Sequence, residues 1–167
     1  MPGVAAALTL GKAMSKSLAR VAAALEAAGL KAEITAPGPT RTAEEAAAAC
    51  GCTLDQIVKS LIFTGQSGRL YLFLTAGGNR LDPARAAALA GETLARADAD
   101  TVRRETGFAI GGVAPLGHLR APVIFADPRL RDFDIVYAAA GTPRHVFGAA
   151  PDALIAACSA RVAPICA

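Results

Sequence analysis

The chain of 167 residues carries a formal net charge of +3, and 53% of its residues are hydrophobic while 19% are charged. A chain of this length can bury roughly two-thirds of its unfolded surface in one domain, and low charge with high apolar content excludes a disordered protein. The 16 glycines and 10 prolines follow no period, which excludes a collagen-like chain, and no apolar run reaches the roughly 18 residues of a membrane-spanning helix.

The N-terminal segment, residues 1–13, is interpreted as a disordered extension or as the product of a misplaced start, because Met14 opens the first helix-like stretch. Its short apolar run has no basic segment ahead of it, so it does not match a secretory signal peptide. We therefore expect a soluble, cytoplasmic protein with one domain over residues 14–167.

The first third of the chain predicts two helices and a strand. A helix is predicted over residues 15–28, where apolar residues recur at helical spacing and Gly29 follows as a C-terminal stop. A strand over residues 31–35 ends at the turn Ala36-Pro-Gly-Pro39. Thr42 and Glu45 have the spacing of a capping box for a helix through about Cys50, and residues 54–58 predict a short helical turn.

The rest of the chain alternates between strands and helices. Two apolar segments, residues 59–64 and 69–75, flank Gly65-Gln-Ser-Gly68 and predict a hairpin inside a sheet. Short connections and mixed elements predict a single α/β or α+β domain. The further predicted elements are helices over 82–90, 98–106 and 152–158, strands over 108–110, 123–126, 135–140 and 145–147, and a short apolar segment over 162–165.

Four cysteines raise the question of a metal site. They are Cys50, Cys52, Cys158 and Cys166, and the chain has only two histidines. A structural zinc site usually draws on paired Cys-x-x-Cys or Cys/His spacings, which are absent. We interpret the cysteines as small buried hydrophobic residues and expect no metal.

The first feature that can carry chemistry is Lys59, within Ile57-Val-Lys-Ser-Leu-Ile-Phe63. Side chains alternate along a strand, so Lys59 shares a face with Leu61 and Phe63, and Ser60 points the other way. The lysine either extends its ammonium into solvent at the end of the strand or holds it in a pocket beside an anionic ligand.

The second feature is a glycine-rich loop, Gly107-Phe-Ala-Ile-Gly-Gly-Val-Ala-Pro-Leu-Gly-His118. Gly111 and Gly112 allow the backbone to approach a ligand closely, and Pro115 fixes one backbone angle. Successive N–H groups in such a loop can bind one oxygen, as in an oxyanion hole. The loop matches neither a Walker motif nor a dinucleotide-binding motif, and a plain structural turn is the alternative interpretation.

The third feature is Ala139-Ala-Gly-Thr-Pro-Arg-His-Val-Phe147, a strand that ends in a Gly-Thr-Pro turn. His145 can act as a general base or as a wall of a substrate pocket, and Arg144 can meet a phosphate. The alternative is that both residues are surface residues of a hairpin without a functional role. The sequence has no Gly-x-Ser-x-Gly elbow, which argues against a serine nucleophile.

Taken in order, these features resemble the family of aminoacyl-tRNA deacylases related to YbaK, EbsC and the editing insertion domain of bacterial prolyl-tRNA synthetases. The resemblance extends over about residues 15–166. The matching stretches are Gln56-Ile-Val-Lys-Ser-Leu-Ile-Phe63, Thr106-Gly-Phe-Ala-Ile-Gly-Gly-Val-Ala-Pro-Leu-Gly117 and Ala140-Gly-Thr-Pro143, together with residues 40–47, 151–154 and 162–165.

The resemblance implies a compact mixed α/β fold, with a pocket over a curved sheet surrounded by helices, and hydrolysis of the ester of a mischarged tRNA. It implies no metal or organic cofactor, whereas the short apolar runs and the dispersed basic residues predict no membrane segment and no stable DNA complex. The implied partners are a mischarged tRNA and prolyl-tRNA synthetase. The implied catalytic residues are Lys59, Gly111 and Gly112, and the implied substrate-binding residues are Ser60, Pro115, Gly141, Thr142, Pro143 and His145.

The resemblance also narrows the substrate and leaves two alternatives. It implies removal of a small wrong amino acid, such as alanine, cysteine or 2-aminobutyrate, from tRNA(Pro). The free hydroxyl of the terminal ribose can then help to position the attacking water, because no paired side-chain base is evident in the sequence. The alternatives are a non-catalytic nucleic-acid-binding module, supported only by the basic charge, and a regulatory relative that binds the aminoacyl group without hydrolysing it.

Overall fold

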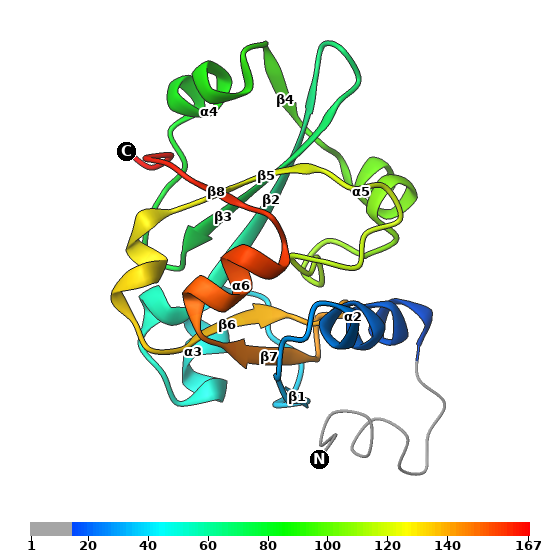
Figure 1. The fold of residues 1–167 in the computed structure, drawn as a ribbon, viewed down its shortest axis with the longest axis vertical. Coiled ribbons are helices and arrows are strands. Elements are labelled where there is room, and N and C mark those ends of the chain that lie inside the picture. The colour runs from blue at the N-terminus through cyan, green and yellow to red at the C-terminus, as the bar shows by residue number, and fades with distance from the viewer. Residues whose placement is uncertain (1–14) are drawn as a thin grey trace.

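The computed structural model describes residues 15–167 (Figure 1), so the predicted extension over residues 1–13 lies outside the described part of the chain. The elements form a mixed α/β domain, as expected from the sequence. In chain order they are α2 (Lys16–Ala27), β1 (Ile34–Thr35), α3 (Ala43–Cys50), η1 (Leu54–Gln56), β2 (Val58–Gly65), β3 (Leu70–Ala76), α4 (Pro83–Ala90), β4 (Leu94–Arg96), α5 (Ala99–Thr106), β5 (Val123–Ala126), η2 (Pro128–Asp132), β6 (Val136–Ala139), β7 (Val146–Ala149), α6 (Pro151–Ala157) and β8 (Arg161–Val162).

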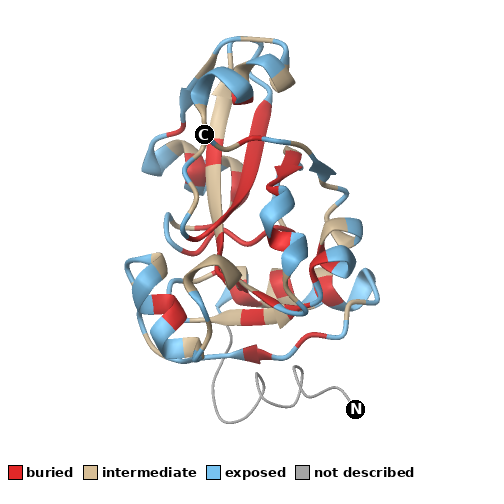
Figure 2. Ribbon diagram, turned by 90° about the vertical axis from the view of Figure 1, so that its left-hand side faces the viewer, coloured by how far each residue is buried: buried red, intermediate tan, exposed pale blue. Residues whose placement is uncertain are grey.

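The main sheet has five strands in the order β4-β2-β3-β5-β8. The predicted hairpin is confirmed, because β2 and β3 pair antiparallel from Val58 opposite Ala76 to Thr64 opposite Leu70. β3 is central and every one of its residues is buried, as the red strand in Figure 2 shows. β5 pairs with β3 and β8 in parallel, so the sheet is mixed.

A smaller antiparallel sheet has the order β1-β7-β6. In Figure 1 it lies at the lower end of the molecule, between α3 and α2. An isolated bridge between Ile57 and Tyr137 joins its strand β6 to the start of β2. β4 pairs with β2 only from Phe63 to Gly65. The first residues of β2 are therefore an edge of the main sheet, close to the smaller sheet.

The two faces of the main sheet bury two separate cores. Val58 and Ile62 belong to the larger core, and Leu61 and Phe63 pack against the second core around Phe73. This confirms the predicted alternation along β2. Lys59 and Ser60, which are consecutive, therefore leave the strand on opposite faces of the sheet.

Side chains cap the starts of α2, α3 and α4. Ser15 and Asp82 cap α2 and α4 through their side chains. Thr42 Oγ1 accepts a hydrogen bond from Glu45 N at 3.1 Å, while the Glu45 carboxylate accepts from Arg41 N at 2.7 Å instead of from Thr42 N. The predicted capping pattern therefore forms, except that the Glu45 side chain bonds to the backbone N–H of the residue before the N-cap.

The predicted strand over residues 108–110 is wrong. Gly107 has a φ of +81°, which ends α5 and turns the chain, and Gly112 N donates to Ala109 O at 2.9 Å to close a second turn. Phe108 is buried between these two turns and is not part of a sheet. The predicted strand over residues 31–35 shortens to Ile34–Thr35, and β4 and η2 were not predicted.

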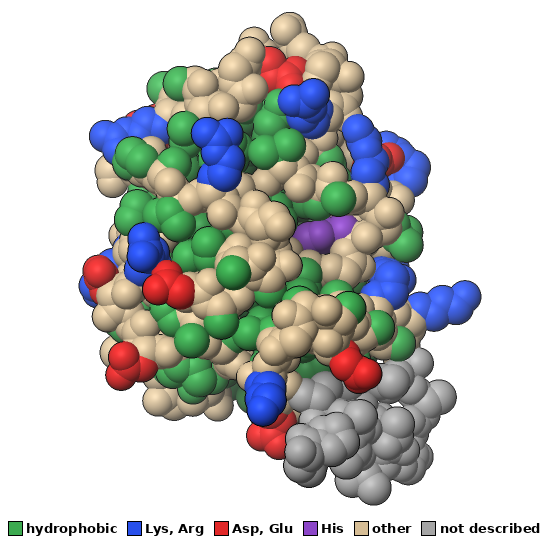
Figure 3. Space-filling model, in the orientation of Figure 1, with side chains coloured by type: hydrophobic (Ala, Val, Ile, Leu, Met, Phe, Trp, Pro, Cys, Tyr) green, Lys and Arg blue, Asp and Glu red, His purple; other side chains and the backbone are tan. Residues whose placement is uncertain are grey.

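A membrane-spanning helix is absent from residues 15–167, and one continuous basic stripe is absent from the face drawn in Figure 3. No helix within residues 15–167 is long and apolar enough to cross a membrane. On the face drawn in Figure 3, Lys and Arg side chains stand as separate groups among hydrophobic and acidic side chains. This arrangement suits a local contact with a polyanion better than an extended one.

Candidate functional site

The glycine loop, residues 107–118, is held rigidly from α2. The Arg20 guanidinium donates to Gly107 O at 2.6 Å and to Gly117 O at 3.2 Å, so one side chain joins the two ends of the loop. The same guanidinium lies 5.1 Å from the centre of the Phe108 ring, which is fully buried. Loop residues between these anchors are therefore presented in a fixed conformation.

His118 also stabilises this loop, through contacts with two other loop residues. Its Nε2 lies 2.6 Å from Ala114 O, and its ring meets Phe108 edge-on with a centroid distance of 5.6 Å. Burial lowers the pKa of His118 to about 4, so the ring is neutral at neutral pH and donates its Nε2 proton to the carbonyl. His118 therefore has a structural role in this loop.

The structure brings the glycine loop and the Gly-Thr-Pro turn into direct contact. A Cβ on Gly112 would lie 2.7 to 2.9 Å from backbone atoms of Thr142, so only glycine fits at that position. Gly111 has a φ of +90° and faces Pro143, because a Cβ on Gly111 would lie 3.8 Å from Pro143 Cγ. The second and third features of the sequence therefore form one site.

The two glycines offer different backbone donors. Gly112 N already donates to Ala109 O at 2.9 Å, so the expected role of Gly112 as an oxyanion donor does not fit this structure. Gly112 is instead a packing residue. Gly111 is exposed, and its N–H has no hydrogen-bond partner within residues 15–167. Gly111 N–H is thus a donor that remains available to a substrate oxygen.

A cavity of about 60 Å³ lies beside Gly111, between β2 and α5. We call it the Ser60 cavity after Ser60, a half-buried lining residue whose Oγ is shielded from solvent. Arg96, from the unpredicted strand β4, stands at the cavity and makes no ion pair within residues 15–167. The cavity is lined by Ser60, Ile62, Arg96, Ala97, Val102, Ile110, Gly111 and Val113.

The Gly-Thr-Pro turn contains a polar pair next to the loop. Thr142 Oγ1 lies 2.6 Å from His145 Nδ1 and accepts from Arg144 N at 3.1 Å. Burial, followed by the nearby Arg144 charge, lowers the pKa of His145, so the ring is neutral at neutral pH. Gly141 has a φ of +98°, and a Cβ there would lie 2.8 Å from Ser17 O. Glycine is therefore required at this turn.

Pro115 is the one predicted loop residue that turns away from this site. It is buried and lines a second hollow of about 360 Å³ between the end of the glycine loop and the end of α6. The other walls of that hollow include His118, Cys158 and Arg161. Pro115 therefore supports the conformation of the loop from the side that faces away from the Ser60 cavity.

Lys59 lies apart from the Ser60 cavity. Its ammonium donates to Asn79 O at 2.6 Å, on the face of the sheet that carries Leu61 and Phe63. The structure thus brings Ser60, Gly111, Gly112, Thr142, Pro143 and His145 into one region, and it places the Lys59 ammonium on the other face of β2. Both faces meet at the open edge of β2, because β4 reaches only as far as Phe63.

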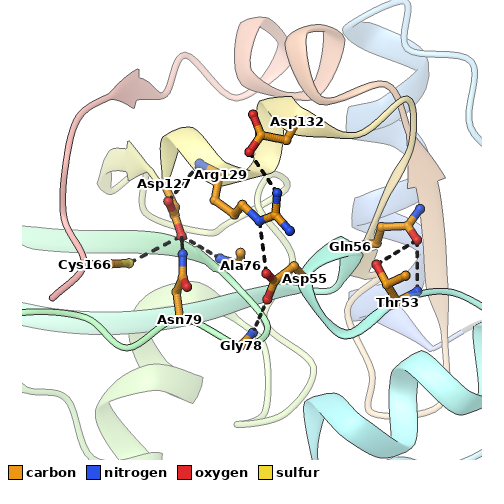
Figure 4. Close-up of polar contacts among 10 residues, drawn as sticks. All are labelled: Thr53, Asp55, Gln56, Ala76, Gly78, Asn79, Asp127, Arg129, Asp132 and Cys166. Atoms are coloured by element: carbon orange, nitrogen blue, oxygen red, sulfur yellow. Dashed lines mark hydrogen bonds and ion pairs between the residues drawn. The ribbon is translucent and has the colours of Figure 1, made fainter.

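A buried carboxylate fixes the surroundings of Lys59 (Figure 4). Asp127 is 3% exposed, and its Oδ2 accepts from Asn79 Nδ2 at 2.8 Å, Ala76 N at 3.0 Å and Cys166 Sγ at 3.4 Å. Burial raises the pKa of Asp127, but the hydrogen bonds from Asn79 and from backbone N–H groups outweigh it and lower the pKa overall. Asp127 is therefore ionised and holds Asn79 in place.

Removing this carboxylate should destabilise the fold. In Asp127→Ala the Ala76 N–H and the Asn79 amide lose their buried acceptor, so we expect a loss of about 3 kcal/mol in the free energy of unfolding, measured with urea. The matched control is Asp132→Ala, which removes an exposed carboxylate beside Arg129 and should cost about 0–1 kcal/mol. Equal losses in the two variants would contradict this reading of Asp127.

The cysteines are all free and partly buried. Burial raises the pKa of Cys158 to about 11, and burial together with the Asp127 charge raises that of Cys166 to about 12, so both are protonated thiols. Within residues 15–167 no three His, Cys, Asp or Glu side chains come together as a metal site.

Comparison with known proteins identifies relatives over most of the chain. Residues 37–157 match the family model described as aminoacyl-tRNA editing domain. A crystal structure of a candidate trans-editing enzyme for prolyl tRNA synthetase is 44% identical, with a TM-score of 0.87 over 93% of this chain and 99% of that one. The crystal structure of hypothetical protein APE2540 is 32% identical, with a TM-score of 0.83 over 89% of this chain and 99% of that one.

A curated relative is the uncharacterized protein YwhH of Bacillus subtilis (strain 168), which is 33% identical over 101 residues. The matched segment is 60% of this chain and 64% of the length of YwhH. The similarity to this relative therefore covers a part of each protein, whereas the structural similarities above extend over nearly the whole chain.

Proposed function

This chain belongs to the aminoacyl-tRNA editing domain family, and we propose that it is a deacylase that hydrolyses the ester between a wrong amino acid and the 3′-terminal adenosine of a tRNA. The reaction takes place at the glycine-loop site, which we define as Ser60, Arg96, Gly111, Thr142 and His145. The observation that carries the proposal is that Gly111, an exposed residue beside the Ser60 cavity, has an N–H without a hydrogen-bond partner within residues 15–167.

The chemistry required is modest, because an aminoacyl ester is already activated. The site must orient the ester carbonyl, donate a hydrogen bond to the oxyanion that forms on it, and admit one water. Gly111 N–H is the donor, and the contacts of the loop with Arg20 and with the Gly-Thr-Pro turn keep it from moving. Such a preorganised donor stabilises the transition state without a cost of reorganisation during the reaction.

The attacking water needs a group that positions it. His145 is neutral and hydrogen-bonded to Thr142, so it is a candidate that orients the water from the turn. The free hydroxyl of the terminal ribose is the second candidate, because it lies next to the scissile ester in every aminoacyl-tRNA. Undiminished hydrolysis of a mischarged tRNA that lacks this ribose hydroxyl would assign the task to the protein.

Arg96 is the residue that we propose to hold the terminal phosphate, since its guanidinium is exposed and free of acidic partners within residues 15–167. Arg96→Ala should raise KM for a mischarged tRNA about tenfold, because charge-assisted contacts with phosphate are lost. It should also reduce by about one the slope of log affinity against log salt concentration.

The matched control is Arg85→Ala, which removes an exposed guanidinium of α4 that pairs with Asp82 at 3.5 Å. This variant should keep the wild-type KM and salt dependence. If Arg85→Ala and Arg96→Ala raise KM equally, the phosphate is held by diffuse charge and not by Arg96.

The substrate tRNA is tRNA(Pro), and the acyl group is a small wrong amino acid such as alanine or cysteine. Support comes from the structural similarity to a candidate trans-editing enzyme for prolyl tRNA synthetase and from the small volume of the cavity. The proposed setting is the cytoplasm, where prolyl-tRNA synthetase charges its tRNA. The test is turnover on mischarged tRNA(Pro), with correctly charged prolyl-tRNA(Pro) as the substrate that the protein should spare.

A further inference from the structure

The turn after β3, residues 77–79, carries the hydrogen-bond acceptor of Lys59. The Lys59 ammonium donates to Asn79 O at 2.6 Å, and no carboxylate pairs with it in the described part of the chain. A neutral carbonyl leaves the charge of the ammonium uncompensated, and the remaining N–H bonds of the ammonium stay available to a ligand. The place of this charge therefore depends on the position of one backbone carbonyl.

Two carboxylates hold this turn, and one arginine joins them (Figure 4). Asp127 Oδ2 accepts from Asn79 Nδ2 at 2.8 Å, and Asp55 Oδ1 accepts from Gly78 N at 2.8 Å. Arg129 Nε donates to Asp55 Oδ2 at 3.0 Å, and Arg129 N donates to Asp127 Oδ1 at 2.9 Å. Since Gly78 and Asn79 are neighbours in the chain, these hydrogen bonds close a ring. We call these five residues the turn network.

The turn is also packed against the segment that leads into β2. A Cβ on Gly77 would collide with Leu54 O, and a Cβ on Gly78 would lie 2.5 Å from Asp55 Oδ1. Leu54 and Asp55 belong to η1, which directly precedes the strand that carries Lys59. The acceptor carbonyl and the lysine that donates to it are therefore fixed relative to the same short helix.

We infer that the turn network positions the Lys59 ammonium for the tRNA end, so that Asp55, Asn79 and Asp127 are positioning residues of the reaction. The inference rests on the proposed deacylase function and adds residues that act through Lys59. A lysine ammonium stands on a flexible four-carbon stem, so it needs a fixed acceptor to stay in one place. A looser turn would keep the charge but displace it, and a displacement of about 1 Å in a catalytic site can cost about 100-fold in rate.

Asn79→Ala is the most selective test. The variant keeps the backbone carbonyl that accepts from Lys59 and removes only the side-chain amide that Asp127 holds. We expect kcat for hydrolysis of a mischarged tRNA(Pro) to fall about tenfold, because the turn is then free to shift. KM should stay within about twofold of the wild-type value, since the Lys59 charge still attracts the tRNA end. Circular dichroism and assays well below the unfolding temperature check that the fold is retained.

Asp55 provides a graded test with a matched control. Asp55→Ala removes the acceptor of Gly78 N and should also lower kcat about tenfold, whereas Asp55→Asn keeps one oxygen for Gly78 N and should restore kcat to within about threefold of the wild type. The control is Asp132→Ala, which removes the other carboxylate that pairs with Arg129. Its kcat and KM should equal those of the wild type, because the hydrogen bonds to the turn remain.

A double-variant cycle shows whether Asn79 acts through Lys59. In the Lys59→Ala background, adding Asn79→Ala should change the single-turnover rate less than about twofold, because no ammonium is left to position. Single-turnover assays with excess protein make this low rate measurable. A further tenfold loss in that background would mean that Asn79 only supports the fold of the site, and it would overturn the inference.

Other outcomes distinguish the inference from the proposed function. Wild-type kcat in both Asn79→Ala and Asp55→Ala would overturn the inference and leave the deacylase function standing. Full activity of Lys59→Ala would do the same, because a lysine without a role needs no positioning. If the wild-type protein hydrolyses no mischarged tRNA(Pro), the deacylase function itself is overturned, and the inference with it.

Discussion

Gly112→Ala should lower kcat/KM for a mischarged tRNA by about 100-fold or more. The added Cβ would stand 2.7 to 2.9 Å from the backbone N, Cα and C atoms of Thr142, which cannot rotate away as a side chain can. The glycine loop and the Gly-Thr-Pro turn must therefore move apart, and Gly111 N–H moves with them. A misplacement of about 1 Å in a catalytic site can cost about 100-fold in rate.

The control for this variant is Gly91→Ala. Gly91 ends α4 with a φ of +75° and has open space around it, so alanine adds backbone strain of about 1 kcal/mol far from the loop. Gly91→Ala should keep wild-type kcat/KM, and both variants should be assayed well below their unfolding temperatures. Full activity of Gly112→Ala would show that contact between loop and turn is not needed for catalysis.

Lys59→Ala should also abolish most of the activity, with an expected loss of about 100-fold in kcat/KM. The resemblance to editing deacylases makes this lysine the central residue, and the structure gives it a fixed position. Its ammonium donates to Asn79 O and has two further N–H bonds that can meet a phosphate or ribose. Charge-assisted hydrogen bonds of this kind contribute about 1.5–3 kcal/mol each.

The open edge of β2 explains how one tRNA end can meet both Lys59 and the glycine-loop site. Lys59 and Ser60 leave this edge on opposite faces, and β4 covers the strand only beyond them. We expect a nucleotide chain that crosses this edge to reach the Lys59 ammonium on one face and Gly111 on the other.

Lys31→Ala, which removes an exposed lysine ahead of β1, is the control and should leave kcat/KM unchanged. Circular dichroism checks the fold of both lysine variants. If Lys59→Ala retains wild-type kcat/KM, Lys59 is not part of the site and only the glycine-loop site remains.

Local signals in the sequence predicted most of the elements because their causes are local. Ser15, Asp82 and Asp98 occupy cap positions whose effect depends only on the next three residues. The β2–β3 hairpin follows from two apolar runs around a short glycine-containing loop. The segment after Gly107 misled the prediction, since Phe108 is apolar because it anchors a loop and not because it belongs to a strand.

The site was only partly visible in the sequence. The glycine motif and the Gly-Thr-Pro motif each signal a special backbone, but nothing local shows that Gly112 packs on Thr142, about 30 residues away. Arg96 was missed because β4 has three residues, two of them exposed, and its position depends on pairing with Phe63. The Gly111 N–H is free because the Gly112 N–H, and not that of Gly111, closes the turn with Ala109 O. Only the folded loop determines which of the two N–H groups makes this bond.

The most direct test of the proposed deacylase function is hydrolysis of mischarged tRNA(Pro) by the purified full chain. Seryl-, cysteinyl- and alanyl-tRNA(Pro) are compared with prolyl-tRNA(Pro), and Gly112→Ala serves as the control for a contaminating hydrolase. We expect the wild-type protein to hydrolyse the mischarged forms and not prolyl-tRNA(Pro), and we expect Gly112→Ala to lose this activity. Hydrolysis of every mischarged form at the spontaneous rate would contradict the proposed function.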